Sequence, residues 1–191
     1  MTVGCAVAAL MAYVGSAAFV YQGVLGFSPL AFSLVFALNA LGMASGGLLS
    51  ARLAHRRVHP ATTVTWVLPG AVTSCLLLTL AAASPWPVLL VLPVFSNAVC
   101  AGMVMTNSMG LAMEHARGLP GAGSAVLGLL MFAPSALATP LPGLVGGVGS
   151  AVPMGVVMTG CTLLTAAVFA AGRAWTARHP ESEASLVAAD R

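Results

Sequence analysis

The sequence predicts an all-α membrane protein with six transmembrane helices. Of its 191 residues, 59% are hydrophobic and only 6% are charged, whereas about a quarter of the residues in a soluble domain are charged. The mean hydropathy of +1.00 agrees with this class. One span needs roughly 20 apolar residues, so six spans take about 120 positions. The expected spans cover residues 2–21, 30–51, 61–83, 88–113, 121–141 and 153–173.

The arginines fall in alternate connections between these spans. They follow the second, fourth and sixth spans: Arg52, Arg56, Arg57, Arg117, Arg173, Arg178 and Arg191. The connections after the first, third and fifth spans carry no charge. Because cytoplasmic loops are enriched in basic residues, we expect a multi-pass protein of the plasma (inner) membrane with both termini in the cytoplasm. The net charge of +3 is spread over three segments and does not indicate a nucleic-acid partner.

Small residues and prolines mark the first three spans. The first span has a small residue at every fourth position, a pattern suited to close helix packing: Gly4, Ala8, Ala12 and Ser16. Pro29 is expected to start the second span, whose glycines form another small face: Gly42, Gly46 and Gly47. The third span contains Pro69 and ends in a short hairpin at residues 84–87, which only adjacent helices could share.

Prolines also shape the last three spans. The fourth span is long enough to tilt. The fifth has Pro134 at its middle and Pro140 near its end, and Pro153 suits the first turn of the sixth. Prolines inside spans three, four and five are typical of a bundle that bends or lines a cavity. Residues 1–175 therefore form a six-helix transmembrane domain, followed by a polar cytoplasmic tail at 176–191.

The sequence offers no enzyme chemistry. No acidic, basic or histidine residue lies deep in a span, so a proton carrier at the membrane midplane is missing. The four cysteines lie in apolar stretches without metal-site or disulfide spacing and are expected to be core residues. Ser124 follows a glycine-rich turn, but no histidine or lysine at membrane depth could activate it. We therefore expect no catalytic residue, no metal ligand and no cofactor.

Two buried amides are the main polar candidates for function. Asn39 lies in the second span and Asn107 in the fourth, where an unpaired amide is costly. They either bond to neighbouring helices or face a central cavity, and the sequence leaves both open. Phe19 and Gln22, near the outer end of the first span, are further cavity candidates.

The loop after the second span carries a more specific pattern. Residues 47–57 read GLLSARLAHRR, which resembles the G-x-x-x-D-R-x-G-R-R loop of major facilitator transporters. Ala51 stands at the acidic position, as in the degenerate copy of that loop after the eighth helix. The resemblance implies an inner gate or latch formed by this loop: Gly47, Arg52, Arg56 and Arg57. Glu114 and Arg117, at the inner end of the fourth span, are either a solvated interface cluster or gate residues that pair with a basic loop.

Other segments are similar to one branch of those transporters. Residues 19–42 resemble the seventh-to-eighth helix segment of bicyclomycin/chloramphenicol-resistance (Bcr/CflA-type) drug–proton antiporters. Asn107 stands where that branch has a Pro-Asn pair in its tenth helix, with Thr106 replacing the proline. Residues 121–125 resemble the start of the eleventh helix. The similarity thus covers helices seven to twelve in order.

The resemblance implies a half bundle built as two inverted three-helix repeats. It also implies multidrug efflux by proton-coupled antiport, with an amphipathic small-molecule substrate and the lipid bilayer as surroundings. Phe19, Gln22, Asn39 and Asn107 would then line the cavity. A partner would be needed, either an N-terminal six-helix half that carries the proton-coupling acid or a second copy of this chain. The alternatives are a six-helix membrane protein that acts in assembly or regulation, and a decayed transporter fragment.

Overall fold

The computed structural model describes residues 1–84, 87–114, 120–146 and 150–178, and within these ranges the chain is helical with no strand. The helices are α1 (Thr2–Ala18), α2 (Pro29–His55), α3 (Pro60–Ala82), α4 (Val91–Glu114), α5 (Pro120–Ala138), α6 (Leu141–Gly146) and α7 (Val152–Arg178). A π-helical turn, Phe19–Val24, extends α1, and a 3₁₀ turn, Pro87–Leu90, precedes α4.

Six segments of the described residues are long and apolar enough to cross a membrane. They are Thr2–Val24, Pro29–His55, Pro60–Ala82, Val91–Met113, Gly121–Val145 and Val152–Arg178. The predicted fold class is therefore confirmed. The last helix continues through Arg178, so the first residues of the predicted tail are helical. Arg117, Arg191 and the rest of the tail lie outside the described residues.

Local chemistry explains where α2 and α3 begin. Pro29 and Pro60 occupy the first turn, where a backbone N–H would have no helical partner. Ser28 Oγ accepts a hydrogen bond from the Ala31 N–H at 3.2 Å, and His59 Nδ1 accepts one from the Ala61 N–H at 3.2 Å. Each cap satisfies a donor that the helix itself leaves open.

The connection from α2 to α3 is closed by two backbone hydrogen bonds. The Arg57 N–H donates to the Ala54 carbonyl at 2.9 Å, and the Val58 N–H donates to the Leu53 carbonyl at 3.1 Å. Arg57 has a φ of 59°, the left-handed conformation that this type of helix end requires. The chain thus reverses direction within a few residues.

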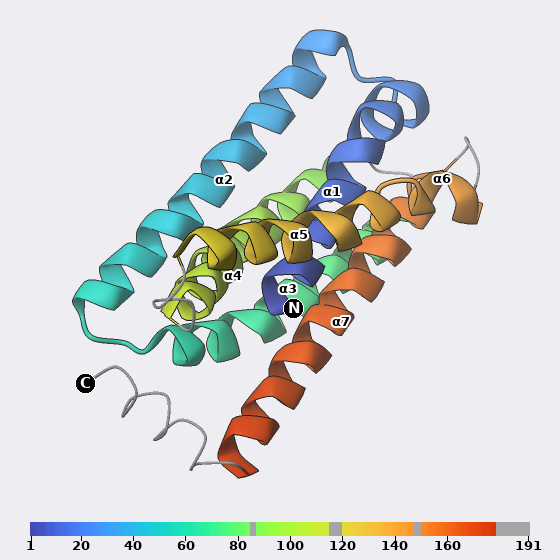
Figure 1. Cartoon of the computed structure of the whole chain (residues 1–191). Coiled ribbons are helices and arrows are strands. Elements are labelled where there is room, and N and C mark those ends of the chain that lie inside the picture. The colour runs from blue at the N-terminus through green and yellow to red at the C-terminus, as the bar shows by residue number, and fades with distance from the viewer. Residues whose placement is uncertain (85–86, 115–119, 147–149, 179–191) are drawn as a thin grey trace.

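Two spans change their helical form near one end. The first span widens into the π-helical turn, where the Leu25 N–H bonds to the Val20 carbonyl five residues earlier, at 3.0 Å. The fifth span breaks between α5 and α6, because Pro140 and Pro142 have no N–H to donate. Figure 1 shows the end of α1 and the short α6 at the same end of the bundle.

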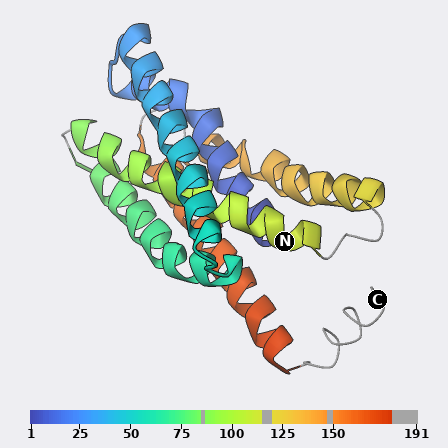
Figure 2. The same ribbon diagram turned by 90° about the vertical axis from the view of Figure 1, so that its left-hand side faces the viewer.

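Each group of three spans packs mainly on the first helix of the other group. α2 and α3 pack on α4, while α5 and α7 pack on α1. α1 also contacts α4, and α3 contacts α7. Exchanging spans one to three with spans four to six leaves this pattern unchanged, which agrees with two three-helix repeats. α1 and α4 are the central helices: in an apolar stretch of 18 residues of each span, 56% and 50% of the residues are buried, against 17% for the second and fifth spans. Figure 2 shows α3 and α5 on opposite sides of the bundle.

Glycines let the central helices approach their neighbours closely. A Cβ on Gly46 of α2 would overlap the Val99 carbonyl of α4, and one on Gly102 of α4 would overlap the Met43 carbonyl of α2. A Cβ on Gly4 of α1 would overlap the Leu130 carbonyl of α5. These contacts place backbone against backbone, as small residues allow in membrane bundles.

Candidate functional site

A cavity of about 230 Å³ lies between α1, α2 and α4, with Met158 of α7 completing its wall. We call it the α1–α2–α4 cavity. Its lining is apolar except for one phenol and two amides: Leu10, Met11, Tyr13, Val14, Phe36, Asn39, Ala40, Met43, Val94, Asn97, Ala98, Ala101 and Met158. The three methionines are flexible and polarisable, so this wall can adapt to ligands of different shape.

Tyr13 and Asn39 join α1 to α2 at this cavity. The Asn39 Nδ2 donates a hydrogen bond to the Tyr13 hydroxyl at 2.7 Å. The Tyr13 ring stacks on Phe36, with centroids 6.3 Å apart and an interplanar angle of 10°. Asn39 is only 5% exposed, yet its Oδ1 meets no hydrogen-bond donor among the described residues. One wall therefore holds a buried acceptor that the protein does not use.

Asn97 forms the polar part of the opposite wall, on α4. Its Oδ1 accepts a hydrogen bond from the Cys75 thiol at 3.4 Å. The same sulfur lies 3.3 Å from the Thr162 hydroxyl, and the Thr159 hydroxyl donates to the Cys75 carbonyl at 3.0 Å. This network between α3, α4 and α7 fixes the Asn97 side chain. Its Nδ2 meets no acceptor in the described ranges and, unlike the Asn39 oxygen, is not fully covered.

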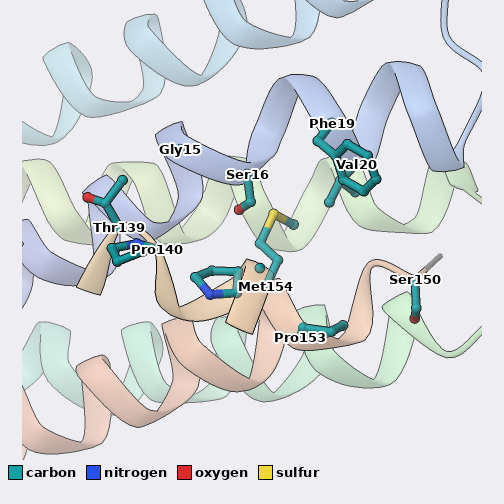
Figure 3. Close-up of a pocket in the computed structure, with 11 residues that line it drawn as sticks. Gly15, Ser16, Phe19, Val20, Thr139, Pro140, Ser150, Pro153 and Met154 are labelled. Carbon is teal, nitrogen blue, oxygen red and sulfur yellow. The ribbon is translucent and has the colours of Figure 1, made fainter. Parts of the chain in front are cut away.

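A second cavity, of about 240 Å³, lies on the other side of α1. We call it the hinge cavity, because it is bounded by the end of α1, the break between α5 and α6, and the start of α7. Figure 3 shows Met154 reaching from α7 toward Ser16 of α1. The Ser16 hydroxyl already donates to the Ala12 carbonyl at 2.6 Å, and the Thr139 hydroxyl to the Ser135 carbonyl at 2.7 Å. The hinge cavity thus offers few free polar groups.

Comparison with known proteins identifies the family. Residues 1–139, most of the chain, match the model of the Major Facilitator Superfamily. The chain belongs to the major facilitator superfamily. It is similar to the uncharacterised MFS-type transporter YdgK of Bacillus subtilis (strain 168), with 32% identity over 158 residues. That alignment covers 83% of this chain and 39% of the relative, so the chain spans well under half of the relative's length. No solved structure matched the chain.

The structure places the four predicted cavity residues of this superfamily member in four different surroundings. Asn39 lines the α1–α2–α4 cavity. Phe19 is 40% exposed and lines the hinge cavity, and Gln22 is exposed on the π-helical turn. Asn107 is buried, and its Nδ2 donates to the Ser50 hydroxyl at 2.8 Å and to the Met103 carbonyl at 2.7 Å. The four side chains do not share one cavity, and their role in binding stays a prediction.

Four of the six predicted gate residues lie near the end of α2. Arg52, Arg56 and Arg57 are exposed there, while Gly47 faces the Thr106 hydroxyl of α4. Glu114 is the last residue of α4, and Arg117 lies outside the described residues.

In this superfamily member, the structure also shows a basic side chain that links two spans. The Arg173 guanidinium donates from Nη1 to the Thr65 hydroxyl at 2.7 Å, which ties α7 to the start of α3. Among the residues described, no group of three or more His, Cys, Asp or Glu side chains lies close enough together to hold a metal ion.

Sequence analysis missed two of the three polar groups in the α1–α2–α4 cavity. Tyr13 lies in the middle of a span, although tyrosine prefers the headgroup level, and that position was a usable signal. Asn97 was visible as a polar residue of the fourth span. Its spacing of ten residues from Asn107 puts the two about 80° apart around α4. Which face meets the cavity depends on the neighbouring helices, which the spacing does not give.

Proposed function

We propose that this chain is one half of a drug-efflux transporter of the Bcr/CflA type, which exchanges an amphipathic small molecule for protons across the plasma membrane. The observation that carries the proposal is the α1–α2–α4 cavity. Its wall is apolar and rich in methionine, with a phenol and two amides and no charged side chain. Such a wall suits a ligand with a large apolar body and few polar groups.

The proposed partner is a second six-helix half. Transporters with inverted repeats bind substrate between two halves that rock around the site. In this chain the second and fifth spans have few buried residues, and their exposed side chains include large apolar ones: Leu30, Leu34, Leu41, Val126, Leu129 and Phe132. A partner half, or a second copy of this chain, would cover part of this surface.

Proton coupling is assigned to that partner. No aspartate or glutamate occurs before Glu114 in the sequence, so the first three spans and nearly all of the fourth carry no acid. A residue that carries protons through a membrane must titrate inside it. We therefore place the coupling acid in the other half, and both termini of this chain in the cytoplasm.

An efflux assay in a bacterial host that lacks its own efflux pumps tests the proposal. Efflux of the neutral dye N-phenyl-1-naphthylamine would be measured with this chain alone, and with this chain co-expressed with the part of YdgK that it does not match. Efflux is expected only from the pair, and an uncoupler that removes the proton gradient is expected to stop it. The Asn39→Leu variant should lower efflux at the same level of membrane-inserted protein.

Two results would contradict the proposal. Efflux from this chain alone would show that it has its own coupling group. No efflux from either combination, with both proteins inserted and stable, would favour a role in assembly or regulation, or a decayed transporter.

A further inference from the structure

The connection from α2 to α3 carries a cluster of exposed basic side chains. Five basic residues lie between positions 52 and 59, and all of them are exposed: Arg52, His55, Arg56, Arg57 and His59. His59 uses its Nδ1 to cap α3, whereas the three guanidinium groups meet no hydrogen-bond or ion-pair partner in the described part of the chain. We call Arg52, Arg56 and Arg57 the arginine cluster. Its positive charge is open to an anion.

The backbone holds the arginine cluster together in an unfavourable arrangement. The Arg56 N–H donates to the Arg52 carbonyl at 3.2 Å. The two side chains therefore lie four residues apart on the same face of the last turn, where like charges repel. Arg57 has a φ of 59°, at which glycine would be less strained. Backbone strain of this kind clusters at ligand-binding positions, and a bound anion would also relieve the repulsion.

The arginine cluster lies where a membrane-spanning helix ends. α2 is long and apolar enough to cross the membrane, and Arg52 is in its last turn. One turn earlier, Leu48 and Leu49 are exposed apolar side chains. On α3, Trp66 is 67% exposed. It lies about 9 Å along the helix from Pro60, a position suited to the headgroup level that tryptophan prefers. A ligand here would meet positive charge and, beside it, an apolar surface.

We propose that the arginine cluster binds the headgroup of an anionic phospholipid such as phosphatidylglycerol. The guanidinium groups donate paired hydrogen bonds to the phosphate oxygens, and the acyl chains lie along the exposed leucines of α2. Basic clusters next to a membrane span attract anionic lipids. A soluble phosphate or an acidic protein segment would use the charge and leave the apolar surface uncovered. This inference goes beyond the proposed function, because it concerns the end of α2 and not the α1–α2–α4 cavity.

A matched pair of lipids tests recognition of the headgroup. Dioleoyl-phosphatidylglycerol and dioleoyl-phosphatidylcholine have the same acyl chains, and only the first carries a net charge. Binding of each radiolabelled lipid to the full chain would be measured in detergent micelles by capture of the tagged protein, after subtraction of the counts captured without protein. Phosphatidylglycerol is expected to bind saturably and about tenfold more tightly than phosphatidylcholine.

Three variants separate the arginine cluster from charge in general. Arg56→Gln should lower the affinity for phosphatidylglycerol about fivefold, the effect of one arginine near the membrane surface. Arg178→Gln removes the same charge from the end of α7, which lies apart from the α2–α3 connection in Figure 1 and Figure 2, and should leave the affinity unchanged. Replacement of all three arginines of the cluster by lysine keeps the charge and loses the paired guanidinium contacts, so the affinity should still fall.

Each alternative has its own signature. Equal affinity for the two lipids, or an unchanged affinity in Arg56→Gln, would overturn the proposal. An unchanged affinity in the triple lysine variant would overturn the guanidinium–phosphate contact and leave only attraction by charge. Displacement of the lipid by an equal concentration of water-soluble glycerophosphoglycerol would assign the cluster to a soluble phosphodiester. Tighter lipid binding after the tail acids Glu181, Glu183 and Asp190 are changed to amides would assign it to the chain's own carboxylates.

Discussion

At the residue scale, Arg57 carries an unfavourable backbone conformation. Its φ of 59° lies in the left-handed region, where a side chain other than that of glycine meets the following carbonyl. Two hydrogen bonds at the end of α2 hold it there. Arg56, the preceding residue, has an ordinary φ of −82° and is exposed as well. The two arginines therefore form a natural pair for separating backbone strain from charge.

Arg57→Gly is expected to stabilise the protein by about 1 kcal/mol, because glycine adopts this conformation without the steric cost. Arg56→Gly removes the same charge without relieving strain, and should destabilise the protein by about 0.5–1 kcal/mol. Unfolding midpoints of the two variants in the same detergent would measure the difference. A midpoint for Arg57→Gly at or below that of Arg56→Gly would contradict the strain argument.

Two buried amides show how far a sequence can predict single residues. Asn39 and Asn107 were predicted to sit inside spans, where they either pair with helices or face a cavity. The structure gives Asn107 two acceptors, on Ser50 and on its own helix, and leaves Asn39 with one unpaired oxygen. That difference depends on Tyr13 and Ser50, which lie on other helices. No pattern within one helix contains this information.

At the element scale, span length was easier to predict than span shape. Apolar length and proline position indicated all six spans, because both are local properties. Pro69 and Pro134 lie inside α3 and α5, while the break comes at Pro140, where a second proline follows two residues later.

The π-helical turn could not be predicted, because nothing in its sequence alone requires the wider turn. In the structure its Tyr21 is fully buried against Phe27 and Phe32 of the next segment.

Gly46→Ala tests the close approach of α2 and α4. The added Cβ would meet the Val99 carbonyl, so the two helices would have to separate. We expect a loss of about 1–3 kcal/mol in stability, as for other overpacked sites. Gly110→Ala in α4 is the matched control, because its Cβ meets nothing within 4 Å. It should be neutral or stabilising by about 0.5–1 kcal/mol. Equal effects of the two changes on the unfolding midpoint would contradict the tight contact.

At the scale of the whole molecule, the distribution of arginine predicts the orientation in the membrane. The α2–α3 connection and the end of α7 carry basic residues, and the end of α3 does not. α3 is long and apolar enough to cross the membrane once. The α2–α3 connection and the far end of α3 should therefore lie on opposite sides of the membrane.

Arg57→Cys and Ala83→Cys would report this orientation, since both positions are exposed. A membrane-impermeant maleimide added to intact cells should label Ala83→Cys at once, and Arg57→Cys only after the membrane is opened. The wild-type protein gives the background from its four native cysteines, which lie within spans. Labelling in the reverse order would place the termini outside the cytoplasm.

The exchange of packing partners between the two repeats has a consequence for biosynthesis. α2 and α3 pack mainly on α4, and α1 receives α5 and α7. During translation α2 and α3 therefore enter the membrane before α4 has been made. α1 enters it before α5 and α7, which are made later still. The contacts between these helices join segments distant in the chain, and such contacts form slowly. Assembly of this bundle is thus a late event, during which exposed polar groups such as Asn39 and Asn97 depend on the insertion machinery or on water.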